Sequence, residues 1–198
     1  MNGGLATLGF AARTGWAAMV ALRGPVSDPQ VIDRRRVQLA TGGAPTQVYH
    51  AARELPPAAA EGLVAQAHEA ARDAARKTMR GAVTELEQTG YRVIGAGLIL
   101  ASGRLPAALS DILASHALLH AAEGELFRDA LADAAAAAGL AVTGVPGRSL
   151  YAQAAAALGL RGDEVAMRVT ALGRPIGPPW RREHKEAALI AWLALAVS

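Results

Sequence analysis

Histidine and acidic side chains gather in one stretch near the middle of the sequence. His116, His120 and Glu123 are spaced by four and three residues, which places them on one face of a helix. Two histidines four residues apart beside a carboxylate can bind Zn²⁺ or another transition metal. Glu123 could instead orient a histidine or pair with Arg128, and the three residues could also form the polar border of an apolar helix stripe. We take His116, His120 and Glu123 as candidate metal ligands.

A second group of titratable residues lies near the end of the sequence. Glu183, His184 and Glu186 stand where the last predicted helix begins, and the two glutamates share a helical face. Acidic residues in a first turn suit the helix dipole without any further function. The alternative is a relocated metal site, so we take Glu183, His184 and Glu186 as candidate catalytic residues.

Basic residues surround these acids. Arg181, Arg182 and Lys185 alternate with them, and mixed charges of this kind also form ordinary surface ion pairs. Arg13 and Thr14 stand in a predicted tight turn near the N-terminus, where they could serve the turn alone or contact an anion. We take all five residues as candidate contacts to nucleic acid.

The composition narrows the classes of protein and site. The chain has 198 residues, which favours a single domain over 1–198, and its net charge of +3 with a pI near 9.8 is compatible with nucleic acid without being diagnostic. The absence of cysteine excludes disulfides, iron–sulfur clusters and thiolate zinc sites. The apolar run 187–197 is too short to span a bilayer, and we expect a soluble cytoplasmic protein with no membrane segment.

The candidate residues must be positioned by a sheet that begins near the N-terminus. The segments 5–10, 16–22 and 30–39 alternate in the manner of strands, and the turn between the first two contains Gly15, which tolerates a positive φ. These segments predict a three-stranded antiparallel meander. Arg34, Arg35 and Arg36 in the third segment suit an edge strand, where charge blocks further pairing, although a phosphate contact is the alternative.

Helices and single strands alternate through the rest of the chain. The predicted helices cover 58–88, 106–138 in two pieces, two short segments between 149 and 173, and 180–196, and the predicted strands cover 91–101 and 140–145. Strands that each follow a helix join a sheet through right-handed crossovers, which place helices on its faces. The sequence therefore predicts an α/β fold with a mixed sheet and helices on both faces.

Several segments resemble one known family. Residues 8–17 look like the first hairpin of the RuvC-type Holliday junction resolvases, and 115–124 look like the helix after that family's fourth strand. In the tail, 157–167 and then 183–191 are similar to the family's last conserved segments in order and spacing. The chain thus resembles a divergent RuvC-like branch of the RNase H-like superfamily, and the resemblance covers most of its length.

The resemblance implies an RNase H-like fold and two-metal phosphodiester hydrolysis, in which carboxylates hold two Mg²⁺ or Mn²⁺ ions. The family needs an acid on the first strand, one at the end of the fourth, and a pair on the last helix. Here the first-strand position is Ala11 or Ala12, the segment 98–101 contains no carboxylate, and Glu183 and Glu186 are the matching pair. The resemblance also places Arg13 and Thr14 where the first hairpin faces the substrate.

These observations leave three functions open. The first is a divergent RuvC-like protein that binds branched or structured DNA and has lost or altered the nuclease chemistry. The second is a metal-dependent enzyme with a relocated site built from His116, His120, Glu123 and the tail glutamates. The third is a non-catalytic interaction protein, for which the flat faces of alanine-rich helices make a homodimer plausible.

Overall fold

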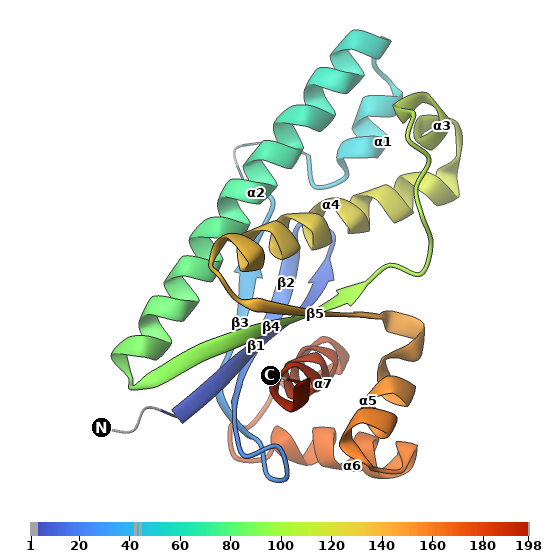
Figure 1. Ribbon diagram of the computed structural model, residues 1–198. Coiled ribbons are helices and arrows are strands. Elements are labelled where there is room, and N and C mark those ends of the chain that lie inside the picture. The colour runs from blue at the N-terminus through green and yellow to red at the C-terminus, as the bar shows by residue number, and fades with distance from the viewer. Residues whose placement is uncertain (1–3, 42, 44, 198) are drawn as a thin grey trace.

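The centre of the computed structural model, which describes residues 4–41, 43 and 45–197, is a five-stranded mixed sheet (Figure 1). Its strands are β1 (Gly4–Arg13), β2 (Trp16–Arg23), β3 (Gln30–Gln38), β4 (Tyr91–Leu100) and β5 (Ala141–Pro146). β1, β2 and β3 pair antiparallel, β4 pairs parallel with β1, and β5 pairs parallel with β4, in the order β3-β2-β1-β4-β5. The predicted meander followed by crossover strands is confirmed.

Helices cover both faces of this sheet, as the sequence predicts (Figure 1). One face carries α1 (Val48–Arg53), α2 (Pro57–Gln88), α3 (Leu109–Ala114) and α4 (His116–Ala137). The other face carries η1 (Gly147–Ser149), α5 (Leu150–Leu158), α6 (Gly162–Leu172) and α7 (Arg182–Val197). In the described part of the chain, none of these helices combines the length and the apolar character needed to cross a membrane.

The two sets of helices bury opposite sides of the same strands. Leu8 and Phe10 of β1 belong to the core under α2 and α4, whereas Ala11 belongs to the core under α7. This alternation follows from the two-residue period of a strand. Because both faces are covered, the central strands are apolar on both sides, as the sequence of β4 predicts.

The arginines of β3 lie on an edge strand and contact other protein groups. Arg34 donates hydrogen bonds to the carbonyl oxygens of Gly177, at 2.9 Å, and Pro179, at 2.6 Å. Arg35 pairs with Glu85 of α2 at 2.6 Å, and Arg36 lies over a tryptophan ring of β2. Because β3 is the end strand in the sheet order, the edge-strand interpretation is confirmed.

α7 lies directly on the backbone of the two central parallel strands. Gly9 of β1 and Gly97 of β4 face it, and a Cβ atom at either position would overlap a carbonyl oxygen of the helix. The Thr7 hydroxyl adds a buried hydrogen bond of 2.8 Å to the carbonyl oxygen of Ala191. This close approach fixes where α7 begins relative to the ends of β1 and β4.

We expect Gly97→Ala to lower the free energy of unfolding by about 3 kcal/mol, because the added methyl group overlaps the α7 backbone. Gly62→Ala in α2 is the matched control, since a Cβ there meets no atom within 4 Å. Relief of glycine's backbone entropy should make that variant more stable by about 0.5–1 kcal/mol. Urea unfolding of both variants measures the difference, and equal midpoints for Gly97→Ala and the wild type would contradict the packing argument.

Candidate functional site

A cleft of about 560 Å³ lies where β1 and β4 end and α7 begins. Its walls are the end of β1, the segment 99–105 at the end of β4 and beyond, one side of α4, and the first two turns of α7. Among the described residues, the charged side chains and the histidine that line it are Arg13, Arg104, Arg128, Arg182, Glu125, Glu186 and His120. Four arginines against two glutamates make this described part of the lining positive, which suits an anionic ligand.

Glu186 joins the two sides of the cleft floor. Its Oε2 atom accepts a hydrogen bond of 2.8 Å from Arg13, and its Oε1 atom accepts one of 2.6 Å from Arg182. The carboxylate is 13% exposed, and the hydrogen bond raises the pKa of Arg182. The structure thus brings together three predicted site residues, and it engages both oxygens of Glu186 with guanidinium groups.

The other tail residues lie outside this cleft. Glu183, Arg181 and Lys185 are absent from the lining among the described residues, and so is His184. His184 instead accepts a hydrogen bond of 3.1 Å at Nδ1 from the backbone N–H of Arg181, and its ring stacks on Trp180. The histidine therefore acts as a capping group at the start of α7, and Glu186 is the one member of the predicted glutamate pair in the cleft lining.

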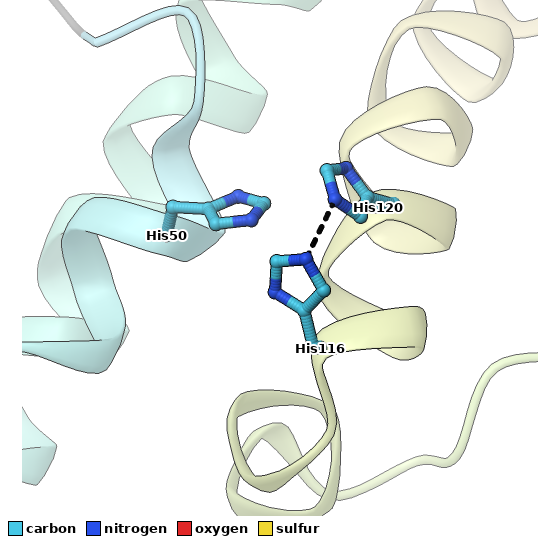
Figure 2. Close-up of side chains that lie close together, drawn as sticks. All are labelled: His50, His116 and His120. Carbon is cyan, nitrogen blue, oxygen red and sulfur yellow. Dashed lines mark hydrogen bonds between the residues drawn. The ribbon is translucent and has the colours of Figure 1, made fainter.

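Three histidines from two helices form a cluster beside the cleft (Figure 2). His116 and His120 of α4 are joined by a 3.1 Å hydrogen bond between their Nε2 atoms. The ring of His50 from α1 lies 5.4 Å from that of His116 and 4.8 Å from that of His120. One nitrogen from each residue falls within 4.8 Å of the other two. His116 and His120 belong to the predicted metal ligands, whereas His50 does not.

Glu123 stands behind this cluster as a buried carboxylate. It is 2% exposed and accepts hydrogen bonds from the backbone N–H groups of Val48, Tyr49 and His50, at 3.1, 2.8 and 3.3 Å. Its Oε1 atom also lies 3.4 Å from Nδ1 of His50. Burial of the Tyr49 hydroxyl, and to a smaller extent the negative charge of Glu123, raise the pKa of Tyr49 to about 12.

Of the predicted ligands His116, His120 and Glu123, the two histidines belong to the group whose ligand atoms lie within 4.8 Å of one another, together with His50, and Glu123 does not. Glu123 lies next to His50 instead, with Oε1 3.4 Å from Nδ1 of that ring, which matches the alternative of a carboxylate that orients a histidine. Arg128 pairs with Glu125 at 3.3 Å rather than with Glu123.

Thr14 lines a second, shallow hollow next to the β1–β2 turn. This hollow, of about 650 Å³, is also lined by Trp16, Arg36 and His50. Arg13 and Thr14 are neighbours in sequence, yet they contribute to different hollows. Because His50 lines one hollow and His120 the other, the histidine cluster lies between them.

Comparisons with known proteins agree with this architecture. No protein-family model matches the sequence, and no curated protein is significantly similar to it. The structure of T. thermophilus RuvC in complex with a Holliday junction substrate superposes with a TM-score of 0.52 at 13% identity, covering 96% of this chain and 91% of that chain. A second structure, of Thermus thermophilus RuvC, gives a TM-score of 0.47 at 12% identity over 95% and 92%. The predicted RuvC-like, RNase H-like fold is confirmed.

We expect Glu123→Ala to lower the free energy of unfolding by about 3 kcal/mol or more, because several buried N–H groups of α1 lose their acceptor. Glu125→Ala, on the same helix, removes only a partly exposed ion pair and should change stability by less than about 1 kcal/mol. Thermal and urea unfolding of the two variants compare these effects. Similar losses in both would show that the Glu123 contacts do not stabilise α1.

We expect His184 to titrate below pH 6.5 in the folded protein. Burial lowers its pKa from 6.5; Glu183 opposes this shift, and Arg34 and Arg181 add to it. Since the unfolded chain then binds more protons, stability from neutral His184 is present above about pH 6.5 and is lost as the pH falls through the folded pKa. Proton NMR of the imidazole measures the pKa, and the stability difference between wild type and His184→Ala should shrink on acidification. A measured pKa at or above 6.5 would contradict this account.

Proposed function

We propose that this protein binds branched or structured DNA in the arginine-lined cleft and does not cleave it by two-metal chemistry. The observation that supports the proposal is a set of four arginines among the described lining residues of one cleft, from the end of β1, the segment after β4, α4 and α7. Guanidinium groups recognise phosphate oxygens through paired N–H donors. The structural relative described above was solved with a Holliday junction substrate, which supports DNA as the ligand.

The arginines keep donors for a ligand after their contacts with the protein. A guanidinium carries five N–H donors, and Glu186 accepts a single hydrogen bond from each of Arg13 and Arg182. The Arg182 side chain is 85% exposed and that of Arg13 is 38% exposed. Glu186 therefore orients the two cations without covering them, which supports a pre-arranged phosphate contact.

A second hollow offers a further cationic group. It is lined by Thr14, Trp16 and Arg36, and the guanidinium of Arg36 lies 4.2 Å above the ring of Trp16. A small anion would need one pocket, whereas a nucleic-acid backbone makes repeated contacts over a longer path. The two hollows together favour the longer ligand.

The Mg²⁺ or Mn²⁺ pair that the RuvC-like fold implies does not fit the residues present. Such ions need several carboxylate ligands, and the described cleft residues offer Glu125 and Glu186, each paired with arginine. Ala11, at a predicted first-strand acid position, is fully buried under α7. We therefore derive no cleavage step at this cleft, and a metal-dependent activity would require another site.

Several expectations from the sequence stay predictions. They are the single domain over 1–198, the cytoplasmic location, the homodimer, and the roles of Glu183, His184, Arg181 and Lys185 in contacts to DNA or in catalysis.

We expect the protein to retard four-way junction DNA in a gel shift or anisotropy titration, more weakly as salt rises, because phosphate contacts release counterions. Arg104→Glu should weaken binding about tenfold or more and reduce the salt dependence. Linear duplex DNA run in parallel shows whether branching matters. Junction DNA should remain intact with Mg²⁺ or Mn²⁺.

Arg161→Glu is the matched control for this test. It changes the net charge equally, but Arg161 is 79% exposed at the start of α6, on the other face of the sheet from α4. Its affinity should stay within about twofold of the wild type, because Arg161 is absent from the cleft lining among the described residues. Equal losses of affinity in both variants would show that binding depends on net charge and not on the cleft. Absence of binding to any DNA would refute the proposal. Metal-dependent cleavage of the junction would refute the statement that the protein does not cleave DNA by two-metal chemistry.

A further inference from the structure

We propose that His50, His116 and His120 bind one Zn²⁺ ion that links α1 to α4. The three imidazoles converge from two helices, and their nitrogens point toward a shared space (Figure 2). His116 and His120 are exposed and His50 is partly buried, so an ion has access from solvent. This site is separate from the carboxylate pair that the fold implies, and its ligands are nitrogen atoms.

The spacing of the nitrogens suits a tetrahedral ion. Zn–N bonds of about 2.0–2.1 Å place the ligand atoms about 3.3–3.4 Å apart in a tetrahedron. The Nε2 atoms of His116 and His120 are 3.1 Å apart, and all three residues offer a nitrogen within 4.8 Å of the others. Rotation of the two exposed rings about their side-chain torsions closes the remaining difference.

Glu123 supplies the outer contact that histidine ligands commonly have. Metal-bound imidazoles usually donate the other ring N–H to a carboxylate, which fixes the tautomer and the ring direction. The Nδ1 atom of His50 lies 3.4 Å from Oε1 of Glu123, and the carboxylate is itself fixed by backbone N–H groups of α1. Donation from Nδ1 leaves Nε2 of His50 free to bind the ion.

The donor set decides which ion fits. Imidazole nitrogens suit Zn²⁺ and related transition metals, whereas Mg²⁺ and Mn²⁺ favour carboxylate and water oxygens. Three protein ligands leave the fourth tetrahedral position of Zn²⁺ to water or to a ligand oxygen. Since His120 also lines the arginine cleft, the ion adds positive charge at the cleft rim, and the use of that charge in binding DNA rests on the proposed function. Zinc binding itself does not depend on the proposed function.

Calorimetric titration of the tag-free, chelator-treated full chain with Zn²⁺ tests the site. We expect one ion per chain, and a melting temperature raised by about 5–10 °C when free Zn²⁺ exceeds the Kd a hundredfold. His50→Ala and His116→Ala should each weaken binding at least a hundredfold. His184→Ala removes a histidine that belongs to the α7 cap and should bind as the wild type does. Circular dichroism confirms that each variant is folded.

A positioning role for Glu123 has its own readout. Glu123→Gln should weaken Zn²⁺ binding about 10- to 100-fold at unchanged stoichiometry, and it should alter the visible absorption of Co²⁺ bound in place of Zn²⁺. Hydrogen exchange of the α1 amides should slow on Zn²⁺ addition in the wild type and not in His116→Ala.

Two results would overturn the proposal: no saturable Zn²⁺ binding, or binding that the His50 and His116 variants leave intact. Junction binding measured with a chelator present tests the cleft without the ion, so either proposal can fail alone.

Discussion

The close contact between α7 and the backbone of β1 and β4 is the constraint on which the rest of the structure depends. Gly9 and Gly97 leave no side chain between the helix and the strands, so α7 has one depth and one position along the sheet. That position sets its first turn beside the ends of both strands, where Glu186 reaches Arg13. The short distance between sheet and helix, which the missing side chains of Gly9 and Gly97 allow, thus places the charged residues at the floor of the cleft.

A buried charge plays the corresponding role on the opposite face. Glu123 is nearly inaccessible, and a carboxylate in such a place must be fully hydrogen-bonded. Its partners are the first N–H groups of α1, which a short helix leaves without partners of its own. The same contacts that satisfy the charge fix His50 against α4. The histidine cluster therefore depends on the hydrogen bonds between Glu123 and α1, which place His50 beside the two histidines of α4.

The sequence predicts local elements well and long-range contacts poorly, for physical reasons. Apolar periodicity and glycine stops locate α2 and β4 within a few residues, and the arginines of β3 correctly indicate an edge strand. His116 and His120 are found because helical spacing is visible in a sequence. His50 lies 73 residues from Glu123 and has no fixed spacing to either histidine of α4, so only the packing of α1 reveals it. Arg104 and Arg128 of the cleft, likewise, meet only once the strand ends are placed.

The charges that line the cleft at the ends of the central strands decide which ligands it can hold. Carboxylates gathered there would attract divalent ions, because their mutual repulsion is relieved by a shared cation. The described residues of this cleft include four arginines instead, and Glu186 neutralises part of the repulsion between Arg13 and Arg182. One backbone can therefore carry either charge at this place, which is why a shared fold leaves the chemistry undetermined. A cation site beside such a cleft must use neutral ligands to escape that pairing, and imidazoles, unlike carboxylates, form no ion pair with a neighbouring guanidinium.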